Sequence, residues 1–449
     1  MRSLKPNFMI SSFCIMATLG MAAVIGGALF AKPFTAHAAT PTPRPKGTVT
    51  FAKDIAPILY QNCTACHRPG EVAPFTLSSY GDAKKRARQI AIVTQSRQMP
   101  PWKANSHGEF QDERRLTDAQ IAAIQQWADQ GAPVGNPKQT PPAPQFASGW
   151  ALGQPDLVLE PSQDFAVGPE GRDVYRCFVV PANLTEDRYV STIDVRPGNR
   201  TIVHHVIAYI DTSGRARRLE AAASDGSPGY SNPGGIGFLP AGMLGGWAPG
   251  AMPHHLPADT GTLLPKGSDV VLEVHYHRDG KPEADRTKVA LYFNNGPVDR
   301  PLHLFPLVNV GIHIPPGEKN YEARASIPII FDVNMLTVFP HMHLLGRQMT
   351  VTATLPDGTK KQLIDVPDWD FNWQGFYAYK KPVHLPGGSR VDLVAHYDNS
   401  ADNPRNPSSP PKEAKWGEQT TDEMCLAFLG FTVDAEHLHH NKQAVGLPK

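Results

Sequence analysis

Hydrophobic positions recur at helical spacing in the first part of the chain, residues 48–136. Thr117 and Gln120 fit a capping box, which predicts the start of a helix, and Gly131 predicts its end. Three apolar faces follow this spacing: Phe51, Ile55, Ile58 and Leu59, then Ala87, Ile90, Ala91 and Thr94, and finally Ile121, Ile124, Trp127 and Ala128. This part of the chain is therefore expected to form a small all-α unit.

From about residue 156 the apolar positions alternate with a period of two, which is typical of half-buried strands. The clearest run extends from Met349 to Leu355, where threonines occupy the alternate face. Similar runs predict strands at 189–195, 202–210, 270–277, 288–293, 336–345, 390–397 and 425–433. So many strands exceed one sandwich, and we expect two all-β antiparallel sandwich domains, 156–298 and 299–434, with a seam near 296–306.

Proline-rich stretches divide a chain that, at 449 residues, exceeds what one hydrophobic core usually supports. One stretch precedes residue 48, and another begins near residue 135. Such segments are stiff and extended, so we assign 137–155 to a linker, and we assign 435–449 to a tail. The predicted fold class is multidomain, with a small all-α domain followed by two all-β domains.

The N-terminal residues 1–38 have the features of an export signal peptide. Arg2 and Lys5 precede an apolar stretch at 9–30, and small residues end at Ala38, where we expect cleavage. The apolar stretch is longer than an ordinary signal core, so its retention as a membrane anchor is the alternative. After cleavage we expect a periplasmic or secreted protein with no membrane span.

The charge balance excludes one class of partner. Lysine and arginine number 43 and aspartate and glutamate 42, so the net charge is close to zero. No segment carries the clustered basic charge that nucleic-acid binding requires, and we exclude nucleic acid as a partner. The 18 histidines and the cysteines carry the candidate chemistry instead.

Cys63, Cys66 and His67 form the C-x-x-C-H pattern of c-type haem attachment. In this pattern two thiols attach the haem vinyl groups, and the histidine ligates the iron. A disulfide or a zinc half-site is the alternative, but the export signal and the surrounding helical unit favour haem. We therefore predict one covalent haem c in a cytochrome c-like domain, residues 48–136.

A sixth ligand to the haem iron is expected from the same unit. Met99 is its one methionine, and the two prolines that follow favour an extended segment. A thioether ligand raises the reduction potential, which suits a domain that accepts and passes on electrons. His107 is the rival ligand.

Cys177 and Cys425 are the remaining cysteines of the exported chain. Unpaired thiols are uncommon in an oxidising compartment. We therefore expect a disulfide between Cys177 and Cys425, which would join distant parts of the β region.

Histidines of the β region occur in pairs. His204 and His205 are adjacent, so in a regular strand their side chains diverge, and joint binding of one metal ion requires a bulge or a strand end. His275 and His277 lie two residues apart and share one face, so spacing does not choose between them.

His341 and His343 also share one face, which allows both to reach one metal ion while Met342 points into the core. A thioether beside two imidazoles favours copper over zinc, and Met424 supplies one. The segment 370–374 is aromatic enough to line a cleft, but we favour core packing for it.

Four motifs together resemble the copper type II ascorbate-dependent monooxygenases, which include the dopamine-hydroxylating and peptide-amidating enzymes. The motifs occur in that family's order: the His204-His205 pair, Val-His-Tyr at His275, His-x-His-Leu-x-Gly from His341, and Asp-Glu-Met-Cys at Met424. The resemblance covers about residues 156–434. A c-haem unit ahead of such a module is similar to the arrangement in bacterial members.

The resemblance implies two mononuclear copper sites in two jelly-roll-like domains, on either side of a solvent cleft. It implies an electron-transfer copper held by His204, His205 and His275, and an oxygen-binding copper held by His341, His343 and Met424. It thereby selects His275 over His277. The expected product is a hydroxylated carbon, formed with O2 and two electrons.

The chain departs from the peptide-amidating branch where that branch binds the substrate carboxylate. An arginine stands there two residues before the His-x-His pair, and polar residues follow the methionine, whereas this chain has Phe339, Leu426 and Phe428. An anionic group would meet apolar surface, so we expect a neutral or apolar small-molecule substrate. Glu273 occupies a position where an uncharged amide is expected in animal members.

The sequence thus predicts a copper monooxygenase that takes electrons from the fused haem, from an ascorbate-like reductant or from another redox protein. Tethering raises the effective concentration of a donor, so we expect the haem to supply the copper at His204, His205 and His275. The alternative is an exported haem and copper electron carrier, or a copper-binding protein, without oxygenase activity.

Overall fold

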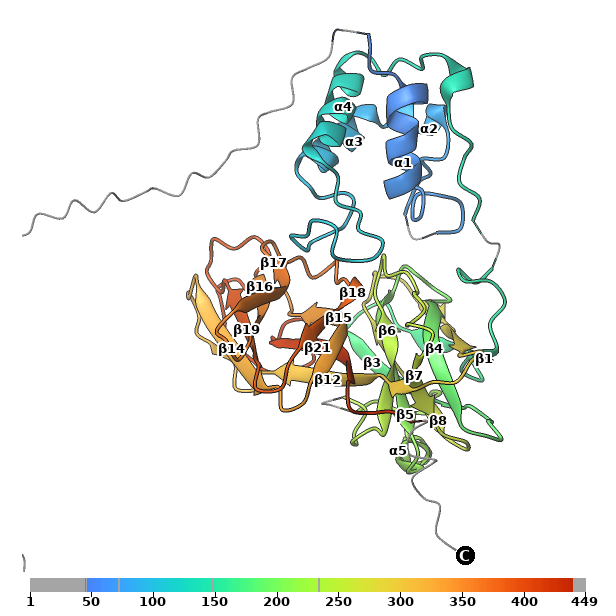
Figure 1. The fold of residues 1–449 in the computed structure, drawn as a ribbon, viewed down its shortest axis with the longest axis vertical. Helices are drawn as coiled ribbons and strands as arrows, with labels where there is room; N and C mark the ends of the chain where they lie inside the picture. The colour runs from blue at the N-terminus through green and yellow to red at the C-terminus, as the bar shows by residue number, and fades with distance from the viewer. Residues whose placement is uncertain (1–44, 46, 72, 147–148, 233–234, 439–449) are drawn as a thin grey trace, which may run out of the picture. The chain divides into compact units, whose positions relative to one another are not determined.

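The computed structural model describes residue 45 and residues 47–71, 73–146, 149–232 and 235–438. The predicted signal peptide and most of the predicted tail lie outside these residues. Within them, helices gather before residue 130 and strands follow from residue 157 (Figure 1). No helix of this described part is long and apolar enough to cross a membrane.

The helical unit packs around one hydrophobic cluster that includes Phe51, Ile55, Leu59, Ile124 and Trp127. The capping box of Thr117 and Gln120 is present as predicted. The short helix α2 was not among the predicted helices, because its six residues are too few to show a helical period. The helical elements are a π-helical turn at Phe51–Ile55, α1 at Ala56–Asn62, α2 at Tyr80–Lys85, α3 at Ala87–Gln95 and α4 at Asp118–Asp129, with a 3-10 turn at Pro137–Gln139 and α5 at Arg215–Ala222 in the β region.

The first β-sandwich packs a five-stranded sheet, ordered β1-β10-β4-β7-β11, against a four-stranded sheet, ordered β3-β8-β5-β6. A separate pair, β2 and β9, completes it. The pairings are antiparallel except for β7 with β11. Its strands are β1 Leu157–Leu159, β2 Phe165–Val167, β3 Val174–Pro181, β4 Arg188–Arg196, β5 Val203–Asp211, β6 Gly242–Trp247, β7 Thr260–Leu264, β8 Asp269–Tyr276, β9 Glu283–Asp285, β10 Lys288–Phe293 and β11 Arg300–Pro301.

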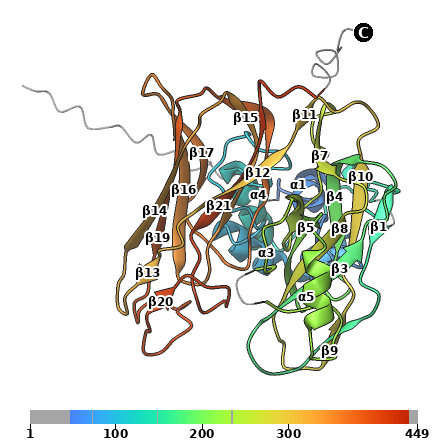
Figure 2. The ribbon, with the colours of Figure 1, turned by 90° about the horizontal axis from the view of Figure 1, so that it is seen from below.

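The second β-sandwich has two four-stranded sheets, ordered β12-β21-β15-β18 and β14-β19-β16-β17, which form separate layers in Figure 2. In β16 the side chains of Met349, Val351 and Ala353 are fully buried between half-buried threonines, which confirms the predicted alternation. Its strands are β12 His303–Val308, β13 His313–Ile314, β14 Tyr321–Pro328, β15 Val333–His341, β16 Gly346–Thr354, β17 Lys360–Val366, β18 Tyr377–Leu385, β19 Arg390–Tyr397, β20 Ala414–Lys415 and β21 Leu426–Val433.

The strand predicted at 336–345 ends earlier, at His341. The reason is the buried carboxylate of Glu423, which accepts backbone N–H groups of His343 at 2.9 Å and Leu345 at 2.6 Å. These bonds draw the chain into a turn, because the two N–H groups are satisfied by a side chain instead of a neighbouring strand. His343 therefore lies just beyond the strand.

The predicted disulfide is wrong. Cys177 and Cys425 are both free and buried. Cys177 packs in a small cluster with Tyr230 and Ala216, while Cys425 packs in the core of the second sandwich. The two thiols belong to separate hydrophobic clusters, and each is already enclosed by its own domain.

Candidate metal centre

Two neighbouring strands of the first sandwich carry three histidines that converge. The register of β5 against β8 shifts between Val203 and His205, which is the irregularity that the adjacent pair required. His205 pairs directly with His275 of β8. The bulge turns His204 toward the same point, so that the ligand nitrogens of His204, His205 and His275 all lie within 4.8 Å of one another.

The facing nitrogens of these three rings are the Nδ1 atoms. His205 Nδ1 lies 3.1 Å from His204 Nδ1 and 3.4 Å from His275 Nδ1. Nitrogens bound to one ion at metal–nitrogen distances of roughly 2.0 Å lie roughly 3–3.5 Å apart. Three ring nitrogens cannot satisfy one another by hydrogen bonding, so the arrangement suits a shared cation.

Asp173 fixes the orientation of His275. Its carboxylate lies 3.0 Å from His275 Nε2, so Nε2–H donates there and Nδ1 keeps its lone pair for the centre of the cluster. Tyr175 stacks on a face of the same ring, with ring centroids 4.2 Å apart. A carboxylate behind a histidine is the usual outer support of a metal ligand.

His341 and His343 lie at the end of β15 with ring centroids 5.1 Å apart. His341 Nδ1 donates to Gln374 Oε1 at 2.6 Å, and His343 Nδ1 donates to the backbone carbonyl of Asp422 at 3.2 Å. Both acceptors fix the tautomer, which leaves each Nε2 with a lone pair. Met342 between them is fully buried in the core, as predicted.

Met424 lines the same cavity as His341 and His343. Its backbone is held at both ends, because its N–H donates to Glu423 at 3.3 Å and its carbonyl accepts from the Tyr397 hydroxyl at 2.8 Å. Glu423 therefore ties the turn that carries His343 to the segment that carries Met424. A pair of imidazoles and a thioether are brought to one cavity.

The two groups of histidines meet, contrary to the expected separation across a solvent cleft. The ring centroids of His205 and His341 are 6.2 Å apart. Both rings line a cavity of about 140 Å³, which we call the metal cavity. It is also lined by aromatic and apolar residues, namely Tyr175, Val206, Ile207, Tyr209, Trp247, Phe339, Phe376, Leu426 and Phe428.

Burial keeps these imidazoles neutral. It lowers the pKa of His341 to about 4 and that of His343 to about 3. Burial also lowers the pKa of His204 to about 4, and the pKa values of His205 and His275 lie well below the ordinary histidine value for the same reason. Neutral imidazole is the form that binds metal, so all five rings are ready as ligands at neutral pH.

Several residues of the site were missed by the sequence analysis. For the segment 370–374 core packing was favoured over lining a cleft, yet the Phe371 ring stacks on His204 with centroids 4.4 Å apart, and Gln374 accepts from His341. Asp173 and Glu423 were not singled out. The acidic residue beside Met424 in the Asp-Glu-Met-Cys motif is the one signal that would have pointed to Glu423.

Glu273 lies on the wall of the metal cavity, where the sequence had placed a departure from the animal enzymes. Burial raises its pKa to about 7, and its Oε2 accepts from the Tyr209 hydroxyl at 3.3 Å. The carboxyl group therefore carries a proton for part of the time at neutral pH. This reduces the negative charge that it places beside His275.

The C-x-x-C-H motif follows α1 in the helical unit. His67 Nδ1 donates to the backbone carbonyl of Phe75 at 3.0 Å, which leaves Nε2 with the lone pair that iron requires. Burial raises the pKa of the Cys63 thiol to about 12 and also raises that of Cys66. Two neutral thiols beside an oriented imidazole fit the chemistry of haem attachment.

Met99, the predicted sixth ligand, lies just after α3 and is half-buried, with its N–H bonded to the Val93 carbonyl at 3.0 Å. The segment that follows it, including Trp102 and Phe110, packs on the second sandwich. Met99 as an iron ligand stays a prediction.

Comparison with known proteins supports the resemblance of the β region to copper type II monooxygenases. Residues 304–444 match the family model of the copper type II ascorbate-dependent monooxygenase, C-terminal domain. A DBH-like monooxygenase protein 1 of Homo sapiens is 25% identical over 309 residues, which is 62% of this chain and 47% of that protein. The chain thus spans about half the length of this relative.

Solved structures give weaker similarity. The major capsid protein P2 of bacteriophage PM2 is 9% identical with a TM-score of 0.26, covering 62% of this chain and 99% of its own. PNGF-II is 8% identical with a TM-score of 0.27, covering 63% of this chain and 66% of its own. A common fold does not follow from similarity at this level.

Proposed function

We propose that this protein is a copper-dependent monooxygenase that uses O2 to hydroxylate a C–H bond of a neutral or apolar small molecule. The matched C-terminal domain family and the distant human relative support the reaction class. The observation that carries the proposal is the meeting of two ligand sets: His204, His205 and His275 converge, and His205 lines one cavity together with His341, His343 and Met424.

The donor atoms of the two sets fit copper. Three imidazoles suit a copper ion that only changes its oxidation state, and two imidazoles with a thioether suit cuprous ion. Bound copper would supply the activation of O2 and the removal of hydrogen from the substrate carbon. The protein's own part is to hold the ligands neutral and oriented through Asp173, Gln374 and Glu423, and to exclude water with apolar walls.

The walls of the site support a substrate without negative charge. None of the described residues that line the metal cavity is a lysine or an arginine, while Glu273 and Glu418 are both present. A second cavity of about 340 Å³, the outer chamber, shares Ile207, Trp247, Phe339, Phe376 and Phe428 with it. An anion in the metal cavity would lose its hydration without gaining a cationic partner from these lining residues, whereas the outer chamber is lined by one lysine, the exposed Lys380.

Phe339 is the residue on which this preference depends most. Its ring stacks on Phe376 with centroids 4.1 Å apart and lies 6.1 Å from the ring of Phe428, so it forms part of the wall between the two cavities. We expect an apolar substrate to have a kcat/KM at least about tenfold above that of its carboxylate analogue, since burial of an unpaired anion is unfavourable. Replacing Phe339 by Arg is expected to reverse this order.

The matched control for Phe339 is Phe305→Arg. Phe305 lies on β12 of the same sandwich, is 41% exposed and does not line either cavity. Its replacement should leave the ratio of the two kcat/KM values unchanged. Turnover of a glycine-extended peptide at a rate comparable to that of apolar compounds would refute the preference.

We also propose that the haem feeds the copper held by His204, His205 and His275. Glu71, four residues after His67, forms an ion pair with Arg200, four residues before His204. Glu71 also binds Arg68 at 2.8 Å, so this ion pair links the haem-attachment loop to the turn that leads into β5. Because these contacts keep the donor and acceptor segments close together, they favour electron transfer within one chain over electron transfer between chains.

Metal and haem analysis of the purified full-length chain, followed by a screen of apolar compounds under labelled O2, tests the reaction. We expect two copper ions and one covalent haem per chain, and one labelled oxygen atom in the product. No more than one copper per chain would refute the proposal. Copper at both sites without labelled product would favour the electron carrier.

A further inference from the structure

One loop contacts histidines from both ligand sets. We call residues 368–374 the positioning loop. Trp369 Nε1 donates to the backbone carbonyl of His343 at 3.1 Å, and Gln374 accepts from His341. Between them, the Phe371 ring stacks on His204 at 4.4 Å and meets His343 edge-on at 5.6 Å. A shift of this loop would move ligands of both candidate copper sites together.

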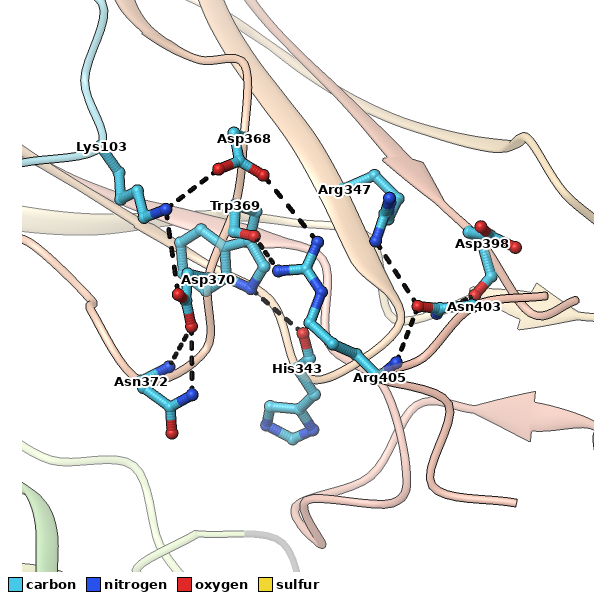
Figure 3. A network of polar contacts seen from close by, with 10 residues as sticks. All are labelled: Lys103, His343, Arg347, Asp368, Trp369, Asp370, Asn372, Asp398, Asn403 and Arg405. Atoms are coloured by element: carbon cyan, nitrogen blue, oxygen red, sulfur yellow. Dashed lines mark hydrogen bonds and ion pairs between the residues drawn. The ribbon is translucent and has the colours of Figure 1, made fainter. Parts of the chain in front are cut away.

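Lys103, which belongs to the helical part of the chain, binds the positioning loop from outside. Its Nζ lies 3.0 Å from Asp368 Oδ2 and 3.8 Å from Asp370 Oδ2, so one ammonium group offsets part of the negative charge of the two carboxylates that flank Trp369. Figure 3 shows Lys103 between these carboxylates, with Trp369 directed at His343. The Lys103 side chain is 11% exposed and that of Asp370 is 22% exposed, so their contact is less screened than an ordinary surface ion pair, whereas Asp368 is 74% exposed.

Arg405 holds the loop from the opposite side. Its guanidinium donates to the Trp369 carbonyl and lies 3.9 Å from Asp368 Oδ1. The backbone N–H of Arg405 donates to Asn403 at 3.0 Å, as Figure 3 shows. Trp369 is 1% exposed. Burial therefore fixes the indole, while Arg405 and Lys103 hold the backbone of the loop on either side of it. The Nε1–H group then donates to the His343 carbonyl from a fixed position.

The segment that carries Lys103 is anchored in the second sandwich. The neighbouring Ala104 is 1% exposed and belongs to that sandwich's core, and Asn105 N–H donates to the Asp365 carbonyl at 2.8 Å. Further along, Phe110 stacks on Tyr379 at 5.0 Å. Lys103 is thus held in place by its own backbone before its side chain reaches the loop.

We infer that Lys103 is a positioning residue, through which the helical part of the chain sets the geometry of both candidate copper sites by way of the positioning loop. The inference rests on the proposed function. Without the ammonium group, Asp368 and Asp370 repel each other across Trp369, and the loop relaxes outward. Displacements well under 1 Å at ligand-supporting groups are enough to change a metal site.

The test compares variants of the full-length chain by copper titration and by the electron paramagnetic resonance spectrum of bound Cu(II). Lys103→Met is expected to weaken copper binding about tenfold, the low end of the usual effect of outer-shell changes, and to alter the copper hyperfine coupling. Lys103→Arg should restore both quantities. Lys319→Met is the matched control, because Lys319 forms an exposed ion pair with Asp402 at 2.6 Å on the same sandwich.

Trp369→Phe provides an independent measurement, because it removes the N–H donor to His343 and keeps an aromatic ring. It must change the hyperfine coupling even if Lys103→Met fails to fold. Wild-type affinity and spectrum in either Lys103→Met or Trp369→Phe overturn the inference while the proposed function stands. A wild-type protein that binds fewer than two copper ions overturns the proposed function and the inference together.

Discussion

Replacing Met424 by Ile is expected to abolish incorporation of labelled oxygen while haem reduction survives. Isoleucine has similar volume but no sulfur, so the site of His341 and His343 loses its soft ligand and with it the stabilisation of cuprous ion. Outer-shell changes already weaken metal sites 10- to 100-fold, so loss of a ligand should lower turnover by more than about a hundredfold. Oxygen-labelled product, measured by mass spectrometry under single-turnover conditions, gives the answer.

Met349→Ile is the control for this replacement. Met349 is fully buried in β16 of the same sandwich and does not line the metal cavity. Exchange of one buried hydrophobic residue for another of similar volume usually costs less than about 1.5 kcal/mol of stability, so turnover should be retained. If Met424→Ile kept its oxygen uptake, O2 would react at another site, and the result would favour the hypothesis of an electron carrier without oxygenase activity.

If Cys63 and Cys66 attach haem, as we propose, removal of both thiols in Cys63→Ala with Cys66→Ala is expected to eliminate covalent haem. The polypeptide should then lack haem absorbance after denaturing extraction, because no thioether bond holds the group. Turnover driven by a physiological redox protein should be lost, whereas turnover driven by excess ascorbate should remain, since the copper ligands lie in the β-sandwiches. Rapid-mixing spectra of the unchanged protein should show reduced haem oxidised by the copper-loaded module.

Cys177→Ala is the matched control, because Cys177 is a buried free thiol outside the haem motif. This variant should retain covalent haem, and it should retain turnover both with the redox protein and with ascorbate as electron donor. Two results would contradict the proposed wiring: reduced haem that is never oxidised by the copper-loaded protein, or redox-protein-driven turnover that persists without covalent haem.

The choice between His275 and His277 shows how much a local hydrophobic pattern can predict. Alternation along 270–277 predicted a strand, and β8 confirms it, but the pattern left His275 and His277 equivalent. The register of β5 against β8 separates them, since His205 pairs with His275 while His277 lies past the strand's end. Register depends on hydrogen bonds between segments far apart in the chain, which a local period does not contain.

Four features could be predicted from the amino-acid order alone: the strand alternation, the capping box at Thr117, the need for a bulge at His204-His205, and the residue types that favour haem and copper. These are local properties, set by side-chain spacing and donor chemistry. The packing of the folded chain was needed to see that His205 lies beside His341, that Cys177 and Cys425 stay apart, and that Lys103, Trp369 and Phe371 lie around the candidate ligands. The physical reason is that burial and contact between distant segments depend on how whole sheets pack.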